Sequence, residues 1–212
     1  MRSTRHRSVP QARRQWVARI GALTIFCLAA GTLSCGDITG PSHDVFRDPS
    51  SVSALMIDSA APMLAADSVG FWAVDGKDRS VDIYFADSGA VPSARLLHFE
   101  VGHSSLDRYP DGRKFKHNDS VFISIRAADP STLSFDFEPA GLKFKSDHPA
   151  TLTINYGRTV PDSVAAPDET ALSLWVQEQT AKPYKKITSS VDTIAKEITG
   201  GVPGFSKYAV AY

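Results

Sequence analysis

Histidine and carboxylate side chains are the residues of this chain that could bind a metal ion or transfer protons. Four histidines lie in the central part of the sequence: His98, His103, His117 and His148. His98 and His103 are expected on a strand and on the loop that follows it, so they need not share a face. A metal site would need Asp111 or Asp119 beside them, and no spacing typical of zinc or calcium ligands joins these residues. The sequence therefore predicts no metal site and no cofactor.

Two acidic pairs have residue types that could act as catalytic carboxylates or calcium ligands. Asp136 and Glu138 alternate with apolar residues, so they share the solvent face of a strand, where they favour solubility. Asp75 and Asp78 flank a Gly-Lys pair and lack the oxygen-rich spacing of a calcium loop. The chain contains no Gly-x-Ser-x-Gly elbow, His-Glu-x-x-His motif or Walker loop. This pattern favours a protein that is not an enzyme.

Aromatic residues are the remaining candidates for a functional surface. Five of them could line a sugar-binding face of a sheet: Trp72, Tyr84, Tyr109, Trp175 and Tyr184. Trp175 alternates with Leu174 and Val176 and is therefore expected on the face away from the core. Trp72 and Trp175 are candidate binding residues, and the alternative is that such aromatics cover a second core or a sheet edge.

The strands that would position these side chains are clearest between residues 132 and 156. Leu133, Phe135 and Phe137 alternate with polar residues, which is typical of a strand with one buried face. Three runs alternate in this way: 133–137, 142–144 and 152–156. A Pro-Ala-Gly turn and a Ser-Asp-His-Pro turn separate them. We expect three consecutive antiparallel strands, a meander within a sandwich.

Similar short runs occur on both sides of this region, and no helical period is sustained. They lie near residues 70–74, 81–85, 94–102, 121–125, 172–176 and 205–212, with less regular ones at 185–190 and 193–199. The pattern predicts an all-β protein, an antiparallel β-sandwich over residues 69–212. Gly200–Gly204 is expected to interrupt the last strands. Residues 35–68 are rich in small and polar residues and predict a flexible tether, of which residues 52–63 are apolar enough to dock onto the domain.

Residues 1–34 have the pattern of an export signal. A basic segment runs to Arg19, and the apolar core Ile20–Ala30 is shorter than the ~20 residues that span a bilayer. The small residue Ser34 before Cys35 resembles the lipobox of bacterial lipoproteins. The resemblance implies cleavage after Ser34 and a lipid on Cys35, which would make the membrane a partner. Ordinary signal cleavage and a signal anchor are the alternatives.

Cysteine content and charge agree with an exported protein. Cys27 lies in the signal core, so residues 36–212 contain no cysteine and no disulfide can form there. Residues 35–212 hold 17 basic and 23 acidic side chains, a formal net charge of −6, which disfavours nucleic acid as a partner. Gly36 follows the cysteine, and resemblance to enterobacterial sorting implies the outer membrane, facing the periplasm or the exterior.

Four sequence features together resemble one domain family. They are Asp111-Gly112 with Phe115, the run SFDFEPAGLKF, the strand ATLTINY and the ending FSKYAV. They resemble the β-sandwich domain of zonula-occludens scaffolds, netrin receptors and ankyrins (the ZU-type domain), which implies binding of a protein or an envelope polymer. Some relatives cut themselves at His-Phe-Ser, and here Gly204 precedes Phe205-Ser206. Self-cleavage by Ser206, or hydrolysis of an envelope polymer, is the alternative to a non-catalytic binding domain.

Replacement of one residue tests the anchor. Cys35→Ala is expected to leave an uncleaved or soluble protein, because acyl chains supply the membrane affinity at ~0.8 kcal/mol per buried methylene. Membrane fractionation and mass spectrometry of the N-terminal peptide provide the measurement. A wild-type mature terminus without lipid would contradict the prediction.

Overall fold

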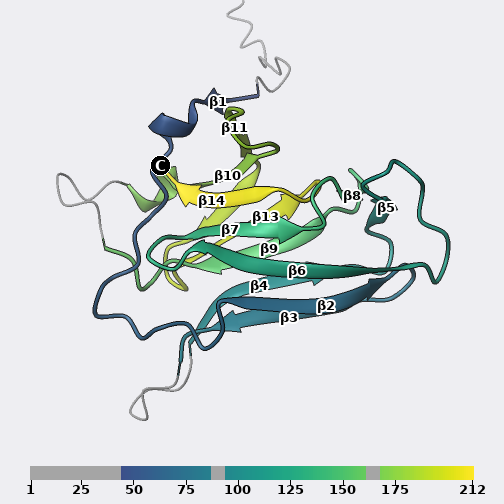
Figure 1. Cartoon of the computed structure of the whole chain (residues 1–212). Helices are drawn as coiled ribbons and strands as arrows, with labels where there is room; N and C mark the ends of the chain where they lie inside the picture. The colour runs from purple at the N-terminus through teal and green to yellow at the C-terminus, as the bar shows by residue number, and fades with distance from the viewer. Residues whose placement is uncertain (1–43, 87–93, 161–167) are drawn as a thin grey trace, which may run out of the picture. The chain divides into compact units, whose positions relative to one another are not determined.

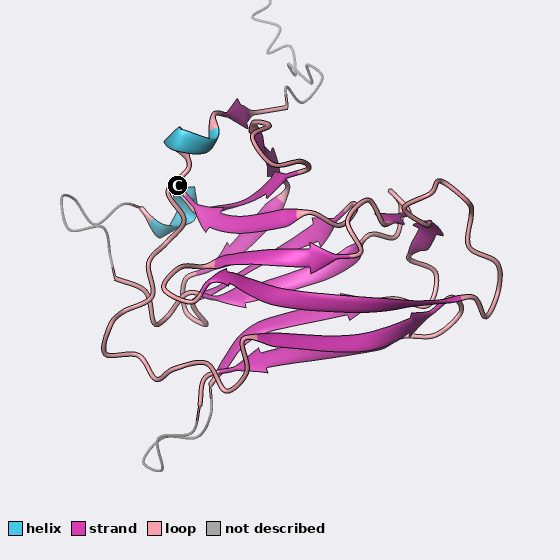
Figure 2. Ribbon diagram, in the orientation of Figure 1, coloured by secondary structure: helices cyan, strands magenta, loops and turns pink. Residues whose placement is uncertain are grey.

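The computed structural model describes residues 44–86, 94–160 and 168–212. In these residues the regular structure is almost entirely β-strand (Figure 2), and the helical turns η1 (Pro49–Ser51) and η2 (Glu169–Ala171) are each three residues long. Two antiparallel sheets pack against each other, and a two-stranded sheet lies at one end of the sandwich (Figure 1). The predicted all-β sandwich is confirmed.

The larger sheet has seven strands and the smaller sheet has five. The larger sheet runs in the order β1 (Phe46–Arg47), β11 (Tyr184–Ile187), β10 (Ser173–Gln177), β14 (Lys207–Ala211), β7 (Ser134–Glu138), β6 (Ser120–Asp129) and β2 (Ser68–Val74). The smaller sheet runs in the order β12 (Ser189–Asp192), β13 (Glu197–Val202), β9 (Ala150–Asn155), β4 (Arg95–Val101) and β3 (Arg79–Tyr84). The separate pair consists of β5 (Leu106–Arg108) and β8 (Lys143–Phe144).

The three alternating runs between residues 132 and 156 form β7, β8 and β9, but they do not form a meander. β7 pairs with β6 and β14 in the larger sheet, β8 pairs with β5, and β9 pairs with β4 and β13 in the smaller sheet. The predicted inward-facing residues of all three runs are buried. The predicted meander is therefore wrong, because alternation reports which face is buried and does not report the neighbouring strand.

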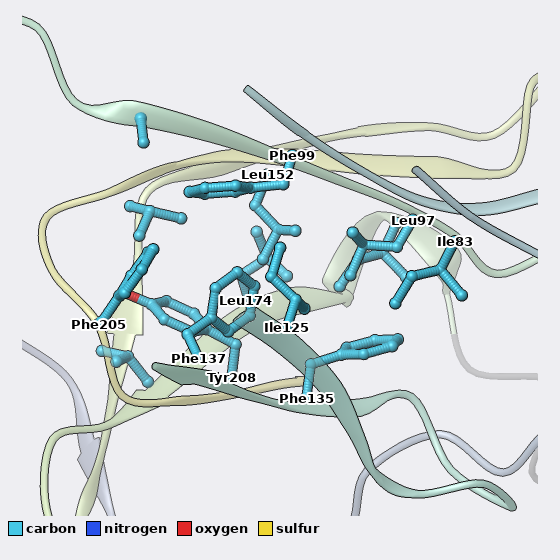
Figure 3. Packing of buried hydrophobic residues seen from close by; sticks show 14 of the residues in the cluster. Ile83, Leu97, Phe99, Ile125, Phe135, Phe137, Leu152, Leu174, Phe205 and Tyr208 are labelled. Carbon is cyan, nitrogen blue, oxygen red and sulfur yellow. The ribbon is translucent and has the colours of Figure 1, made fainter. Parts of the chain in front are cut away.

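Aromatic rings from both sheets meet in the centre of the core (Figure 3). Phe99 on β4 lies against Phe137 on β7, with ring centroids 5.3 Å apart, and against Phe205 before β14, at 5.6 Å. Phe137 also contacts Tyr208 on β14 edge to face, at 5.1 Å. Such tilted ring pairs stabilise a core beyond the area that they bury, so this cluster joins β4 of one sheet to β7 and β14 of the other.

The last strand, β14, has two different apolar faces. Tyr208 and Val210 belong to the main core, whereas Ala209 and Ala211 belong to a second cluster on the opposite side of the sheet. This arrangement confirms the alternation expected for the closing strand. The second cluster also contains Trp175 and Tyr184 and is completed by residues of the N-terminal segment.

Residues 44–65, here named the N-terminal strap, run along the sandwich. Lys186 N–H donates to the Val45 carbonyl and Leu55 N–H donates to the Val210 carbonyl, both at 2.9 Å. Leu55 is 7% exposed and belongs to the main core. The described part of the predicted tether, residues 44–65, is therefore docked onto the sandwich.

Strand β13 continues through Gly200 and Gly201, where the sequence predicts an interruption. A Cβ atom on Gly200 would lie 2.8 Å from Leu174 Cδ1 and 3.0 Å from the Thr188 carbonyl oxygen. The predicted interruption is wrong at these residues. Glycine allows neighbouring segments of the chain to approach the backbone of β13 closely there, and it does not start a turn.

The central core generates a stability prediction. Phe137→Ala is expected to lower the free energy of unfolding by about 3–5 kcal/mol, because it removes a buried ring and leaves a cavity among three aromatic neighbours. The matched control is Asp136→Ala on the outer face, whose half-exposed ion pair contributes about 1 kcal/mol or less. Chemical denaturation measures both. Equal losses would contradict the assigned alternation.

Candidate functional site

Polar side chains form a row across the outer face of the larger sheet, the face turned away from the smaller sheet. Residues paired across neighbouring strands share a face, and the pairing joins Ser68 to Arg126, Arg126 to Asp136, Asp136 to Lys207, and Lys207 to Gln177. Phe137 and Tyr208, the neighbours of Asp136 and Lys207 in sequence, are buried on the inner face. Burial of those two rings therefore turns the row toward solvent.

An open groove of about 770 Å³ follows this row. Its lining residues come from β2, β6, β7, β10 and β14 and from the segments adjoining these strands: Ser68, Ser124, Arg126, Asp136, Phe137, Glu138, Ala140, Gln177, Glu178, Gln179, Thr180, Ser206 and Lys207. The Arg126 guanidinium donates to the Asp136 carboxylate at 3.2 Å. The Gln177 side-chain amide donates to the Lys182 carbonyl at 2.9 Å, which holds the loop after β10. The groove thus has a hydrogen-bonded floor of strands.

Two exposed aromatic side chains continue the same face of β2 and β6 beyond the groove. Trp72 is 59% exposed and Phe122 is 48% exposed. They are cross-strand partners, with ring centroids 5.5 Å apart in an edge-to-face arrangement. Phe122 also lies over Gly70, where an added Cβ would be 2.5 Å from its Cζ atom. Because Gly70 has no side chain, the Phe122 ring packs directly against the sheet backbone. This packing fixes the position of the aromatic pair beside the polar groove.

Ser206 lines the groove, but its hydroxyl has a structural partner. It donates a hydrogen bond to the Gln177 carbonyl and so links the start of β14 to the end of β10. Among the described residues, none of the four histidines considered above contacts Ser206: His98 pairs with Asp82, His103 with Asp78 and His148 with Asp147, and His117 lies against Gly76. The serine is positioned to hold two strands together.

Gly204 precedes Phe205-Ser206, and its surroundings leave no room for a side chain. A Cβ atom there would lie 2.7 Å from the Leu142 carbonyl oxygen, a backbone atom that cannot easily move. The Gly204 carbonyl accepts a hydrogen bond from the Tyr208 hydroxyl. Burial raises the pKa of the Tyr208 phenol, so this hydroxyl keeps its proton and donates. A histidine would not fit this site without displacement of the chain near Leu142.

The expected exposure of Trp175 is wrong. Its side chain is 1% exposed, its indole N–H donates to the Ala211 carbonyl at 3.3 Å, and the Arg47 guanidinium lies 4.7 Å above its ring. The alternation is correct, because Trp175 does point away from the main core. The N-terminal strap covers it with Val52 and Ala54. Trp175 is therefore excluded as a surface residue, and Trp72 is the candidate of the two that lies on the surface.

Of the acidic pairs named from the sequence, Asp136 and Glu138 line the groove, whereas His98, His103 and Asp78 are not among its lining residues. His98 Nδ1 is 2.7 Å from Asp82 on the smaller sheet. A hydrogen bond from the His103 backbone N–H lowers the pKa of Asp78. The described residues contain no group of three or more histidine, cysteine or acidic side chains placed to hold a metal ion.

Cys35 lies outside the residues that the structure describes. Within the described ranges, no helix is long and apolar enough to cross a bilayer. Comparison with known proteins gives no match to a family model, a curated protein or a solved structure. The function is therefore argued from the residues of this chain.

The groove itself was not predicted, although part of its signal is in the sequence. Ser68, Gly70 and Trp72 alternate with apolar residues, and so do Phe122, Ser124 and Arg126. A glycine and two aromatic residues on otherwise polar faces indicate an unusual surface. The pairing of these two strands with each other is what brings Trp72 beside Phe122.

The environment of Ser206 predicts that the chain stays intact. Purified full-length protein is expected to give one polypeptide mass under denaturing conditions, because the Ser206 hydroxyl is engaged with the Gln177 carbonyl and the described histidines pair with other residues. Ser206→Ala is the control and should give the same pattern. Two fragments separated at Phe205–Ser206 in the wild type, and a single chain in Ser206→Ala, would contradict the prediction.

Proposed function

We propose that this protein is a lipid-anchored component of a bacterial cell envelope, attached through Cys35, whose sandwich binds a partner and catalyses no reaction. The observation that carries the proposal is the groove on the outer face of the larger sheet together with the exposed Trp72–Phe122 pair, which lies beyond the groove on the same face. A functional surface of this kind needs apolar area for affinity and polar groups for orientation. The groove and the aromatic pair supply both on one face.

The exposure of the aromatic pair supports a binding role. Aromatic side chains bury much of their surface when they stabilise a fold, yet more than half of Trp72 is in contact with solvent. Trp175, on the same face of the sheet, is covered completely by the strap. The strap thus covers one end of the outer face, whereas among the described residues Trp72 at the other end remains exposed, and we place the partner there.

Rigidity of the surface is a second support. The groove floor consists of strands whose opposite faces belong to the main core, so a ligand would meet side chains that are already positioned. The resemblance to ZU-type domains, which mainly bind other molecules, and the export signal agree with a displayed binding domain. In this proposal Ser206 has a structural role and no catalytic one.

Site-specific photo-crosslinking in intact cells tests the proposal. A photoreactive amino acid replaces Glu178 on the groove rim of the full-length protein, and the matched control replaces Glu100, an exposed glutamate on β4 of the smaller sheet. Adducts with an envelope component are expected from position 178 and not from position 100. Equal adducts from both positions, or none from position 178, would contradict a binding role for the groove.

A further inference from the structure

The exposed aromatic pair beyond the groove suits a flat ring whose faces are apolar. Trp72 and Phe122 lie side by side on the two outermost strands of this end of the sheet, β2 and β6. A pyranose ring carries C–H bonds on its faces and hydroxyl groups around its edge. Such a ring stacks on an aromatic side chain through its face, and it needs polar partners at its edge.

The groove provides those polar partners on the same face, beginning at Ser124, which lies two residues along β6 from Phe122 and pairs with Glu138. A sugar hydroxyl both donates and accepts hydrogen bonds, so it fits a surface where donors and acceptors alternate. Arg126 and Lys207 are donors, and Asp136 and Glu138 are acceptors, on adjacent strands. The Arg126 side chain is 66% exposed even though it pairs with Asp136, so much of its guanidinium remains accessible to a ligand.

The charge of the groove excludes several other ligand classes. Its lining holds two basic side chains, Arg126 and Lys207, and three acidic ones, Asp136, Glu138 and Glu178. This nearly balanced set, slightly negative, offers no attraction to phosphate-rich polymers or nucleic acid. An uncharged ligand with many hydroxyl groups matches it better.

The location of the groove argues against an extended peptide. Peptides that add to a sheet bind along a free edge, where backbone N–H and C=O groups are unpaired. This groove crosses the face of the sheet over strands that are already paired on both sides, such as β6, β7 and β14. From Ser68 to Gln177 the row spans four strand spacings, about 19 Å, which is the length of a short oligosaccharide.

From the juxtaposition of these features we infer that the groove and the adjoining aromatic pair bind an uncharged polysaccharide of pyranose units in an extended conformation. One ring stacks on Trp72, and neighbouring units direct their hydroxyl groups to the Arg126–Asp136 pair, Glu138 and Lys207. The inference rests on the proposed binding role of this groove and specifies its ligand class. The same chemistry occurs in the glycan strands of a cell wall and in neutral polysaccharides outside the cell, so the test includes both sources.

Co-sedimentation of the detergent-solubilised full-length protein tests the inference. The two insoluble probes are purified peptidoglycan sacculi and cellulose, and depletion of protein from the supernatant gives the dissociation constant. We expect saturable binding to at least one probe. Binding to sacculi alone would identify the ligand as cell-wall glycan, and binding to cellulose alone would identify it as a polysaccharide outside the cell. Binding to both would show that the groove recognises the pyranose chain common to the two probes.

Three variants test whether binding to these probes depends on the Trp72 side chain. Trp72→Ala should weaken binding at least about tenfold, as expected for an aromatic anchor. Trp72→Phe, which keeps an aromatic ring, should stay within about threefold of the wild type. Tyr84→Ala removes an exposed aromatic residue from the smaller sheet and should bind like the wild type. Thermal unfolding of each variant separates loss of binding from loss of fold.

Two outcomes would overturn the inference. One is absence of binding to both probes, and the other is equal binding by the wild type and a folded Trp72→Ala variant. If position 178 nevertheless crosslinks to an envelope protein in cells, the proposed binding role of the groove stands and only the ligand class is wrong. If position 178 gives no adduct and neither probe binds, both proposals fail.

Discussion

Phe99 and Phe137 meet across the two sheets with their ring centroids 5.3 Å apart, and the rest of the structure depends on this contact and on the rings around it. Phe205 and Tyr208 join the same cluster from the closing segment of the chain. Because side chains alternate along a strand, burial of Phe137 and Tyr208 turns Asp136 and Lys207 to the outer face. The core therefore determines which residues form the groove, and a register shift of one residue would bury its charges.

The outer face of the larger sheet is divided by the N-terminal strap. Small residues on β14, Ala209 and Ala211, leave room for the Trp175 ring, and the strap covers that ring with Val52 and Ala54. Hydrogen bonds of Leu55 with Val210 and Leu133 fasten the strap to β14 and to the residue before β7. At the other end of the same face nothing in the described part of the chain covers Trp72, and we place the ligand there.

The closing segment shows how one short motif can have a purely architectural use. Phe205 fills the aromatic cluster, Ser206 donates to the Gln177 carbonyl, and Gly204 allows the chain to pass close to Leu142. Each residue is explained by packing or hydrogen bonding.

The sequence by itself determined which side chains are buried in most strands. The alternation of Leu133, Phe135 and Phe137, and that of Tyr208 and Val210, is local information, because a strand has a period of two whatever its neighbours are. The all-β class followed from many such runs. The position of the docked strap and the continuity of β13 could not be predicted from the sequence. Small residues and glycines occur both in loops and in closely packed strands, so their presence does not distinguish the two.

Only the tertiary structure decided which strands are neighbours, and with that the burial of Trp175 and the existence of the groove. β7, β8 and β9 follow one another in the chain but lie in three different sheets. The groove row takes residues from positions as far apart as Ser68 and Lys207. Strand pairing depends on contacts between residues distant in sequence, whose combined packing selects one arrangement, and no local pattern carries that information.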